Sequence, residues 1–509
     1  MNNRQNLIHI CLQIAVLLPA VARAQFTLTT NNGVITITGY TGTNSTVVIP
    51  GTTNGHPVTS IGDFAVQCLD FANNVTIPNG ITDIGTGAFN YCRNLTNVTI
   101  GGSVTNIGTD AFMGCSGLTN IILPGSVTSI GNFAFYDCTG LTNVTFPHNA
   151  ASIGNSAFEG CTSLGKVVIP DEVLSMGDGA FSACTGLTNV TLGKSINSLG
   201  AAPFESCNRL KTITVDQLND VFICVAGALF NKSQTTLYEY FAGNTEASYV
   251  IPNSVINLET SSFSGCGGLK NITIPNSVAN IGDNVFESCT GLSSITIPNS
   301  ATNIGNDAFE YCLGLTNAVI GTSVMALGQG AFEGCPLRSI TIPDSVTSIG
   351  SGAFENCSSL TSLTIPSSVA SLGFATFCDC YDLRSIYCEG NAPSGGNNDQ
   401  FCCAPLVTVY YLPGTTGWLA TFGGNATALW TLPYPLILNE NSFGGRTNGF
   451  GFTISWSTNI PVVVEACTNL SSPVWQPVQT NTLVNGTNYF SEPQWTNYQG
   501  RFYRLHSLQ

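Results

Sequence analysis

Cysteine is the residue of this chain whose type and spacing most clearly invite chemistry. The chain of 509 residues contains 20 cysteines. Twelve of them recur at a step of 23 residues, apart from one step of 22 and one of 59. They are Cys92, Cys115, Cys138, Cys161, Cys184, Cys207, Cys266, Cys289, Cys312, Cys335, Cys357 and Cys380. Thiols in such a series could pair as disulfides, bind a metal ion, or pack as small apolar groups.

The elements that would position these thiols are the coils of a solenoid, because a fixed period of twenty to thirty residues is the signature of stacked repeats. One unit reads CTGLSSITIPNSATNIGNDAFEYC from Cys289. Its residues from Leu292 to Ile297 alternate as a short strand, and Pro298 ends that strand. Ile304 and Phe309 then close the coil on the opposite side. We predict thirteen such coils, which share one apolar core.

Stacking decides how the cysteines are used. Equivalent residues of neighbouring coils lie about 4.8 Å apart, just beyond the Cβ separation of about 3.5–4.5 Å that a disulfide requires. We therefore predict a reduced, buried ladder, with scattered disulfides or metal binding as the alternatives. Four cysteines cluster outside the regular period, and a disulfide among them is as plausible as free thiols. They are Cys378, Cys388, Cys402 and Cys403.

The repeat resembles the BspA-like leucine-rich-repeat family. The family pattern C-x-x-L-x-x-I-x-I-P-x-S-V-x-x-I-G-x-x-A-F-x-x-C is matched well from Cys335 to Cys357, and the resemblance covers residues 58–385. It implies a parallel β-sheet with an irregular or short-helical convex side. The segment 208–265 resembles the longer, hairpin-containing repeat of that family, so we interpret it as an enlarged coil rather than a domain break.

The two ends of the chain differ from the repeats. Residues 1–24 have the charged, apolar and A-x-A parts of a secretory signal peptide. Residues 25–57 and 386–434 are predicted to form β-rich caps. Residues 435–509 alternate like short antiparallel strands, which predicts a small β-sandwich-like module. This module resembles those appended to exported proteins of Verrucomicrobia-like bacteria. We expect a secreted or cell-surface bacterial protein without a transmembrane segment.

Acidic residues also recur. One carboxylate stands two residues before the repeat cysteine in four consecutive coils, at Glu287, Glu310, Glu333 and Glu355. Stacking would align them, either as a solvated ridge or as a weak calcium site. The formal net charge of the chain is −15, and this acidity argues against a nucleic-acid partner.

The sequence gives no sign of catalysis. Only 8% of the residues are charged, whereas an active site gathers titratable groups in a cleft. The three histidines beyond the predicted signal peptide are His56, His148 and His506, which lie in distant regions. Serine-hydrolase and zinc-protease motifs are absent. We predict no enzyme and no cofactor.

Short polar side chains recur at the outward positions of the predicted strands. An extended face of hydroxyl and amide groups suits a protein or glycan ligand, although threonine also favours strands and keeps a sheet soluble. An ice-binding-like role would need a flatter sheet. The candidate binding face consists of Thr96, Asn97, Thr99, Thr142, Asn143, Thr145, Thr188, Asn189, Thr191, Lys270, Asn271, Thr273, Thr361, Ser362 and Thr364.

The functional hypothesis rests on that face and on the resemblance. Members of the BspA-like family are associated with adhesion, which implies protein–protein interaction or adhesion through the Thr/Asn/Ser-rich face. One alternative is a glycan-binding accessory protein that acts through Trp456, Trp475 and Trp495 of the C-terminal module, although such tryptophans also serve in cores. The other alternative is a structural envelope component that binds nothing.

Overall fold

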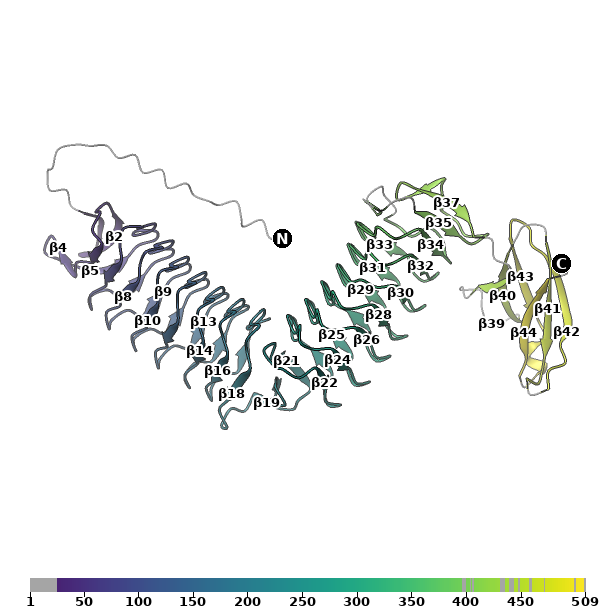
Figure 1. Ribbon diagram of the computed structural model, residues 1–509, viewed down its shortest axis with the longest axis horizontal. Coiled ribbons are helices and arrows are strands. Elements are labelled where there is room, and N and C mark those ends of the chain that lie inside the picture. The colour runs from purple at the N-terminus through teal and green to yellow at the C-terminus, as the bar shows by residue number, and fades with distance from the viewer. Residues whose placement is uncertain are drawn as a thin grey trace. The chain divides into compact units, whose positions relative to one another are not determined.

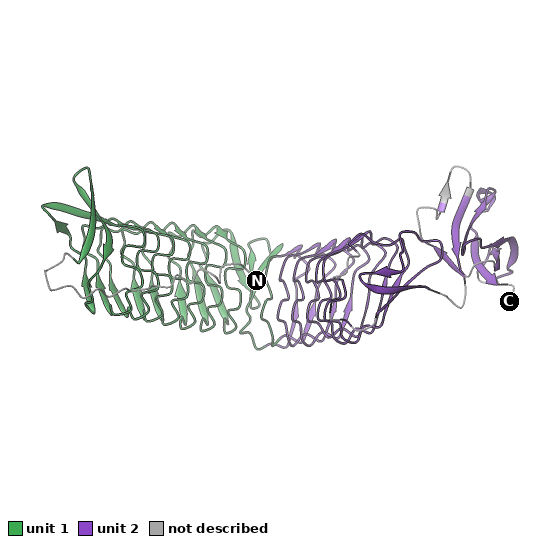
Figure 2. Cartoon of the chain, turned by 90° about the horizontal axis from the view of Figure 1, so that it is seen from above, with its two compact units in different colours: residues 1–245, 259–268 green, residues 246–258, 269–509 purple. Residues whose placement is uncertain are grey.

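The structure is a computed structural model. It describes residues 25–395, 400–402, 404, 407–430, 435–438, 444–446, 449–456, 460–470, 472–498 and 500–507. The predicted signal peptide and Cys403 lie outside these residues. The chain divides into two compact units (Figure 2). Unit 1 comprises the chain up to Thr245 together with Glu259–Gly268, and unit 2 comprises Glu246–Leu258 and Leu269–Gln509.

Unit 1 is a parallel β-solenoid (Figure 1). In its face strands the central residue is buried and its neighbours point outward, which is the alternation that the sequence predicts. The strands pair in the orders β12-β10-β8-β6-β3 and β14-β16-β18. Their bounds are β3 (Thr46–Val48), β6 (Asn74–Thr76), β8 (Asn97–Thr99), β10 (Asn120–Ile122), β12 (Asn143–Thr145), β14 (Lys166–Val168), β16 (Asn189–Leu192) and β18 (Thr212–Val215).

A second sheet closes the coils of unit 1 on another side. It runs in the order β1-β2-β5-β7-β9-β11-β13-β15-β17, and β4 (Thr52–Thr53) pairs with β5. The first strands are long, namely β1 (Phe26–Asn31), β2 (Val34–Tyr40) and β5 (His56–Ile61). The rest have two residues each: β7 (Asp83–Ile84), β9 (Asn106–Ile107), β11 (Ser129–Ile130), β13 (Ser152–Ile153), β15 (Ser175–Met176) and β17 (Ser198–Leu199).

Unit 2 repeats this plan. Its face strands are β22 (Ser248–Val250), β24 (Asn271–Thr273), β26 (Ser294–Thr296), β28 (Asn317–Val319), β30 (Ser339–Thr341), β32 (Ser362–Ile365), β34 (Ser385–Cys388) and β35 (Thr408–Tyr411). The last face strand pairs with β37 (Asn425–Leu429), which also pairs with β36 (Thr421–Phe422). The second column consists of β23 (Asn257–Leu258), β25 (Asn280–Ile281), β27 (Asn303–Ile304), β29 (Ala326–Leu327), β31 (Ser348–Ile349) and β33 (Ser371–Leu372).

The solenoid is longer than the sequence pattern predicts. Eight face strands in unit 1 and eight in unit 2 make sixteen, against thirteen expected coils. The three additional strands, β3, β22 and β35, lie beside segments that lack the Phe-x-x-Cys pattern. Coils therefore extend into both predicted caps. On the turn side the described coils are irregular and not helical, so of the two forms expected for the convex side the irregular one is found.

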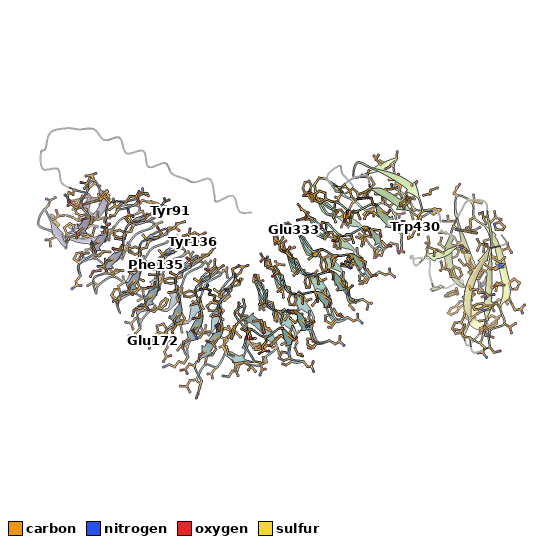
Figure 3. The ribbon with its side chains drawn as sticks, in the orientation of Figure 1. Tyr91, Phe135, Tyr136, Glu172, Glu333 and Trp430 are labelled. Atoms are coloured by element: carbon orange, nitrogen blue, oxygen red, sulfur yellow. A yellow bond between two sulfur atoms is a disulfide. The ribbon has the colours of Figure 1, made fainter. Side chains whose placement is uncertain are left out.

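The core of each unit is a ladder of aromatic rings. In unit 1 the rings of Phe112 and Phe135 stack with centroids 5.3 Å apart and planes 4° apart; Figure 3 labels Phe135 within the stack. In unit 2 the series continues as far as Phe401, which lies 5.5 Å from Phe377. These rings are buried. Parallel stacking follows from the repeat, because each coil presents the same residue at the same height.

The repeat cysteines are buried beside this ladder, as predicted. Burial raises the pKa of the Cys138 thiol to about 12, which keeps it protonated. Within the described residues the one disulfide joins Cys378 to Cys402. It lies in the irregular cluster, for which a disulfide and free thiols were equally plausible from the sequence.

The enlarged coil contains the expected hairpin within unit 1. Strands β19 (Phe222–Val225) and β20 (Ala228–Asn231) pair as an antiparallel hairpin, and β21 (Thr236–Tyr240) pairs with β20. The boundary between the two compact units falls in this segment. The regular Phe-x-x-Cys pattern is also interrupted there.

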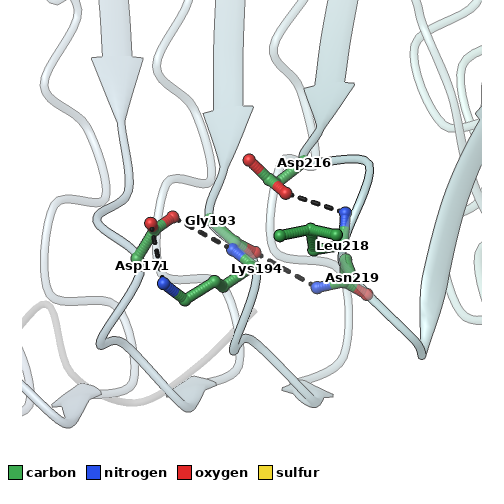
Figure 4. A network of polar contacts seen from close by, with 6 residues as sticks. All are labelled: Asp171, Gly193, Lys194, Asp216, Leu218 and Asn219. Carbon is green, nitrogen blue, oxygen red and sulfur yellow. Dashed lines mark hydrogen bonds and ion pairs between the residues drawn. The ribbon is translucent and has the colours of Figure 1, made fainter.

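The fully buried side chain of Asn219 closes the last regular coil of unit 1 (Figure 4). Its Nδ2 donates hydrogen bonds to the carbonyls of Gly193 (3.1 Å) and Ile196 (2.9 Å). Its Oδ1 accepts hydrogen bonds from the backbone N–H groups of Val221 (2.9 Å) and Phe222 (2.8 Å). One amide thus satisfies four backbone groups where the coil pattern ends.

The C-terminal module consists of two antiparallel sheets. One contains β38 (Leu436–Leu438), β39 (Gly444–Arg446), β40 (Gly449–Ser455) and β43 (Thr487–Glu492). The other contains β41 (Pro461–Cys467), β42 (Gln476–Thr482) and β44 (Phe502–Ser507), and a short 3₁₀ helix, η1, spans Trp495–Asn497. The two sheets contribute to one small apolar core, as in a β-sandwich.

Candidate functional site

The predicted binding residues lie on the face strands, or immediately before them, in register along each unit. In unit 1, for example, β10 pairs with β12, so that Asn120 lies opposite Asn143 and Ile122 lies opposite Thr145. In unit 2, Asn271 to Thr273 are opposite Ser248 to Val250. The parallel register therefore gathers residues that are 23 positions apart in the sequence into straight columns.

The first column consists of the residues directly before the face strands, and its threonines form hydrogen bonds between neighbouring coils. The hydroxyl of Thr96 donates a hydrogen bond of 3.0 Å to the carbonyl of Asn73, which is 23 residues earlier. Thr142 donates in the same way to Thr119 (2.8 Å) and Thr188 to Gly165 (2.9 Å). These three hydroxyls connect neighbouring coils, and their oxygens can still accept a hydrogen bond from a partner.

The second column is an amide ladder. Asn143 donates from Nδ2 to Oδ1 of Asn120 at 2.9 Å. Asn189 donates to the hydroxyl of Thr212 at 2.6 Å, and Asn271 donates to the hydroxyl of Ser248 at 3.3 Å. Asn97, Lys270 and Ser362 are exposed at or next to equivalent positions. Each amide in such a ladder keeps spare donors and acceptors for an external partner.

The third column contains exposed aliphatic residues as well as the predicted threonines. Thr99, Thr145, Thr273 and Thr364 are exposed, and Thr191 is half-buried. Five further members of the column are exposed aliphatic residues, with exposed fractions between 50% and 68%: Val48, Ile122, Val168, Val250 and Val319. Every member up to Thr364 is thus Thr, Val or Ile. We call this series the β-branched column. The period itself was the signal that would have revealed the aliphatic members.

The face is hollowed in unit 2. A shallow depression of about 560 Å³ lies over β28 and β30. Val319 and Thr341 of the β-branched column line it, together with Thr322, and Asp344 is the charged residue of its lining. Its lining thus combines methyl groups, hydroxyl groups and one carboxylate.

The acidic row is a half-buried feature of unit 2, and Figure 3 labels Glu333. Burial raises the pKa of Glu310 to about 7, with further contributions from the negative charges of Glu333, Asp307 and Glu287. Burial likewise raises the pKa of Glu333 and of Glu355. The structure contains no group of three or more acidic, His or Cys side chains, among the residues it describes, that could hold a metal ion. We therefore do not carry the calcium hypothesis further.

One of the three tryptophans of the alternative glycan platform is buried, and the other two are half-buried. Trp456 is only 6% exposed and packs in the module core with Phe452 and Phe490. The guanidinium carbon of Arg504 lies 4.5 Å from the ring centroid of Trp475. Trp495 belongs to η1, and its ring centroid lies 6.3 Å from that of Phe450. A buried indole has no face to offer a sugar ring.

Comparison with known proteins identifies the repeat. The profile of the BspA type leucine rich repeat region matches in six copies, over residues 27–138, 105–236, 234–342 and 302–416. These matches cover well over half of the chain. The chain belongs to the BspA-type leucine-rich-repeat family. This finding agrees with the resemblance that the repeat motif carries.

Solved structures support the same assignment. A leucine rich cell surface protein from Faecalibacterium prausnitzii is 30% identical with a TM-score of 0.58, and the match covers 74% of this BspA-type chain and 96% of that chain. The pneumococcal vaccine antigen PcpA is 21% identical with a TM-score of 0.54, covering 80% and 97%. The likeness to PcpA concerns the fold alone. No curated protein matches the chain.

The BspA-type family is one of repeat scaffolds that present a surface for protein interactions. In this chain the surface that repeats most regularly is the set of face strands, whose outward residues are nearly all uncharged. The described part of the chain has no helix that is both long and apolar enough to span a membrane.

Proposed function

We propose that this BspA-type protein is exported, acts at the cell surface or after secretion, and binds other proteins through the face strands, as an adhesin does. The observation that carries the proposal is the β-branched column, which runs over the eight face strands of unit 1 and the first six of unit 2, beside a column that contains the amide ladder. Such a surface combines exposed methyl groups with unused amide donors and acceptors. It can therefore exclude water from an interface while satisfying polar groups of the partner.

Two further observations support this proposal. The depression over β28 and β30 offers a concave position for a protruding side chain of a partner. The relative from Faecalibacterium prausnitzii is described as a cell surface protein, and its match extends over 96% of its chain. The proposal gives the chain no catalytic role, in line with its 8% of charged residues.

The test is a binding screen with the purified mature chain, residues 25–509, against immobilised extracellular-matrix and cell-surface proteins. The control is the same chain shortened to residues 25–434, which lacks the C-terminal module. We expect both forms to bind the same protein ligand. If binding were lost with the module, the binding residues would lie in the module, and its tryptophans would be the candidates. No protein ligand for either form would favour a structural envelope component.

A further inference from the structure

The β-branched column of unit 2 ends in aromatic residues. Its last two positions are Tyr387 in β34 and Tyr410 in β35. Their rings are stacked, with centroids 5.1 Å apart and planes 15° apart. The indole of Trp430, which directly follows β37 and is labelled in Figure 3, lies 4.8 Å from the ring of Tyr387 and is tilted by 42°. All three side chains are half-buried, so each retains some contact with solvent.

The register of the sheet shows where this stack stops. Tyr387 is opposite Tyr410 in the pair of β34 and β35, and Tyr410 is opposite Ala428 in the pair of β35 and β37. Residues that are opposite in parallel strands lie side by side on the same face. The side of the Tyr410 ring away from Tyr387 therefore faces a methyl group, where a longer stack would have a third ring.

The face strands around the aromatic rings present hydroxyl groups outward. Two charged residues flank β34: Arg384, whose guanidinium donates to the carbonyl of Tyr381, and the half-buried Glu389. The outward residues of the adjoining face strands are Ser362 and Thr364 in β32, Ser385 in β34 and Thr408 in β35. Each carries a hydroxyl that can donate one hydrogen bond and accept others. A surface of hydroxyl groups and aromatic rings matches a ligand that has many hydroxyl groups of its own.

We propose that this end of the sheet is a binding site for a neutral sugar, with one ring of the sugar placed over Ala428 against the open side of Tyr410. The C–H face of a pyranose ring is apolar and slightly positive, whereas the face of an aromatic ring is negative, so the two attract each other when stacked. Trp430 would contact a neighbouring sugar unit, and the hydroxyls of Ser385 and Thr408 would bind its hydroxyls.

The site differs from the glycan platform considered in the sequence analysis. That hypothesis concerned Trp456, Trp475 and Trp495 of the C-terminal module, whereas the present site belongs to the solenoid. It also goes beyond the proposed binding of proteins. It uses the aromatic end of one column, while the protein-binding proposal depends on the Thr, Val and Ile residues before it. The two proposals can therefore fail separately.

The experiment uses the mature chain and an array of neutral oligosaccharides of glucose, mannose and N-acetylglucosamine, with sialylated and sulfated glycans as charged probes. Dissociation constants for the bound sugars follow from calorimetry. Tyr410→Ala removes the stacking surface. Ala428→Leu keeps all three aromatic side chains and fills the space beside Tyr410. Leu429→Ala is the matched control, because Leu429 is exposed on the same strand but its side chain points to the other side of the sheet.

We expect at least one neutral sugar to bind. Tyr410→Ala and Ala428→Leu should each weaken it by about tenfold or more, which corresponds to about 1.4 kcal/mol. Leu429→Ala should change the dissociation constant by less than about twofold. The proposal is wrong if only charged glycans bind, if no sugar binds, or if the loss follows Leu429→Ala equally.

Discussion

The thiol of Cys312 donates a hydrogen bond of 3.0 Å to the main-chain carbonyl of Phe286, one coil earlier. Cys335 donates in the same way to Phe309 at 3.0 Å, and Cys115 to Phe89 at 3.2 Å. The cysteine ladder is therefore more than apolar filling, because each thiol is a second donor to a buried carbonyl that also accepts the backbone N–H of the cysteine in its own coil. An alanine at this position would lack this hydrogen bond.

The first prediction compares the two ladders. Phe309→Ala should lower the free energy of unfolding by about 3–5 kcal/mol, because a buried ring leaves a cavity. Cys312→Ala should cost about 1–2 kcal/mol, for the loss of one small buried group and one hydrogen bond, because the Phe286 carbonyl keeps the N–H of Cys289 as a donor. Urea unfolding of the mature chain measures both. If Cys312→Ala proved as destabilising as Phe309→Ala, the thiol would have a role beyond packing and one hydrogen bond.

The second prediction concerns thiol reactivity. Burial raises the pKa of Cys138 and of Cys184 to about 12, so both thiols stay protonated and shielded. We expect the repeat cysteines to resist iodoacetamide in the native chain at pH 8 and to react fully after unfolding without a reductant. Peptide mass spectrometry should find Cys378 linked to Cys402. Repeat cysteines that were mostly paired after unfolding would replace the ladder with a covalently stapled solenoid.

The third prediction is a dependence of stability on pH. Folding raises the pKa of Glu310 from the ordinary value of 4.5 to about 7. A carboxyl with a raised pKa favours the folded state in its neutral form, so its contribution is complete below the ordinary pKa and is lost as the pH rises through the folded pKa. Between pH 5 and pH 8 the wild-type chain should lose more stability than Glu310→Gln, which cannot ionise. Parallel pH profiles of the thermal midpoint would contradict this prediction.

The fourth prediction concerns the end of the regular coils in unit 1. Asn219→Ala should cost about 3 kcal/mol or more, because it leaves buried backbone donors and acceptors without partners. Lys194→Ala is the control from the same network. Lys194 lies 3.3 Å from Asp171 in an ion pair that is about half exposed, and its loss should cost less than about 1 kcal/mol. Equal costs in urea unfolding would show that Asn219 does not organise this junction.

The repeat architecture could be predicted because every coil has to present the same apolar residues at the same height. Leu292, Ile295 and Phe309 were assigned to the core from spacing alone, and all three are buried. The sequence pattern failed at β3, β22 and β35, where pairing with a neighbouring strand forms a coil without the Phe-x-x-Cys motif. In those coils the strand forms by pairing with the strand of the adjacent coil, and the repeat motif in the sequence does not reveal this pairing.

Side-chain interactions between coils could not be predicted from the sequence either. Thr96 and Thr99 are both exposed threonines, and nothing in the sequence showed that the hydroxyl of Thr96 donates to the preceding coil. The aromatic ring of Tyr91 likewise occupies the space that a Cβ at Gly114 would fill, and Gly114 has φ of +69°. Such contacts join residues 23 positions apart, so they appear only when the register of the coils is known.

The central claim is that the face strands carry the protein-binding surface. The most direct measurement is the dissociation constant of the best protein ligand for two triple variants. The first variant places Glu at Thr99, Ile122 and Thr145 of the β-branched column. The second variant places Glu at Thr82, Thr105 and Thr128, which are exposed on another side of unit 1.

The account predicts that the first variant weakens binding by about a hundredfold or more and that the second changes it by less than about threefold. The second variant also removes a hydrogen bond between coils, because the hydroxyl of Thr105 donates to the carbonyl of Thr82 at 3.0 Å. It therefore controls for binding that is lost only because the fold is weakened. Unchanged binding by the first variant, or an equal loss in both, would contradict the claim.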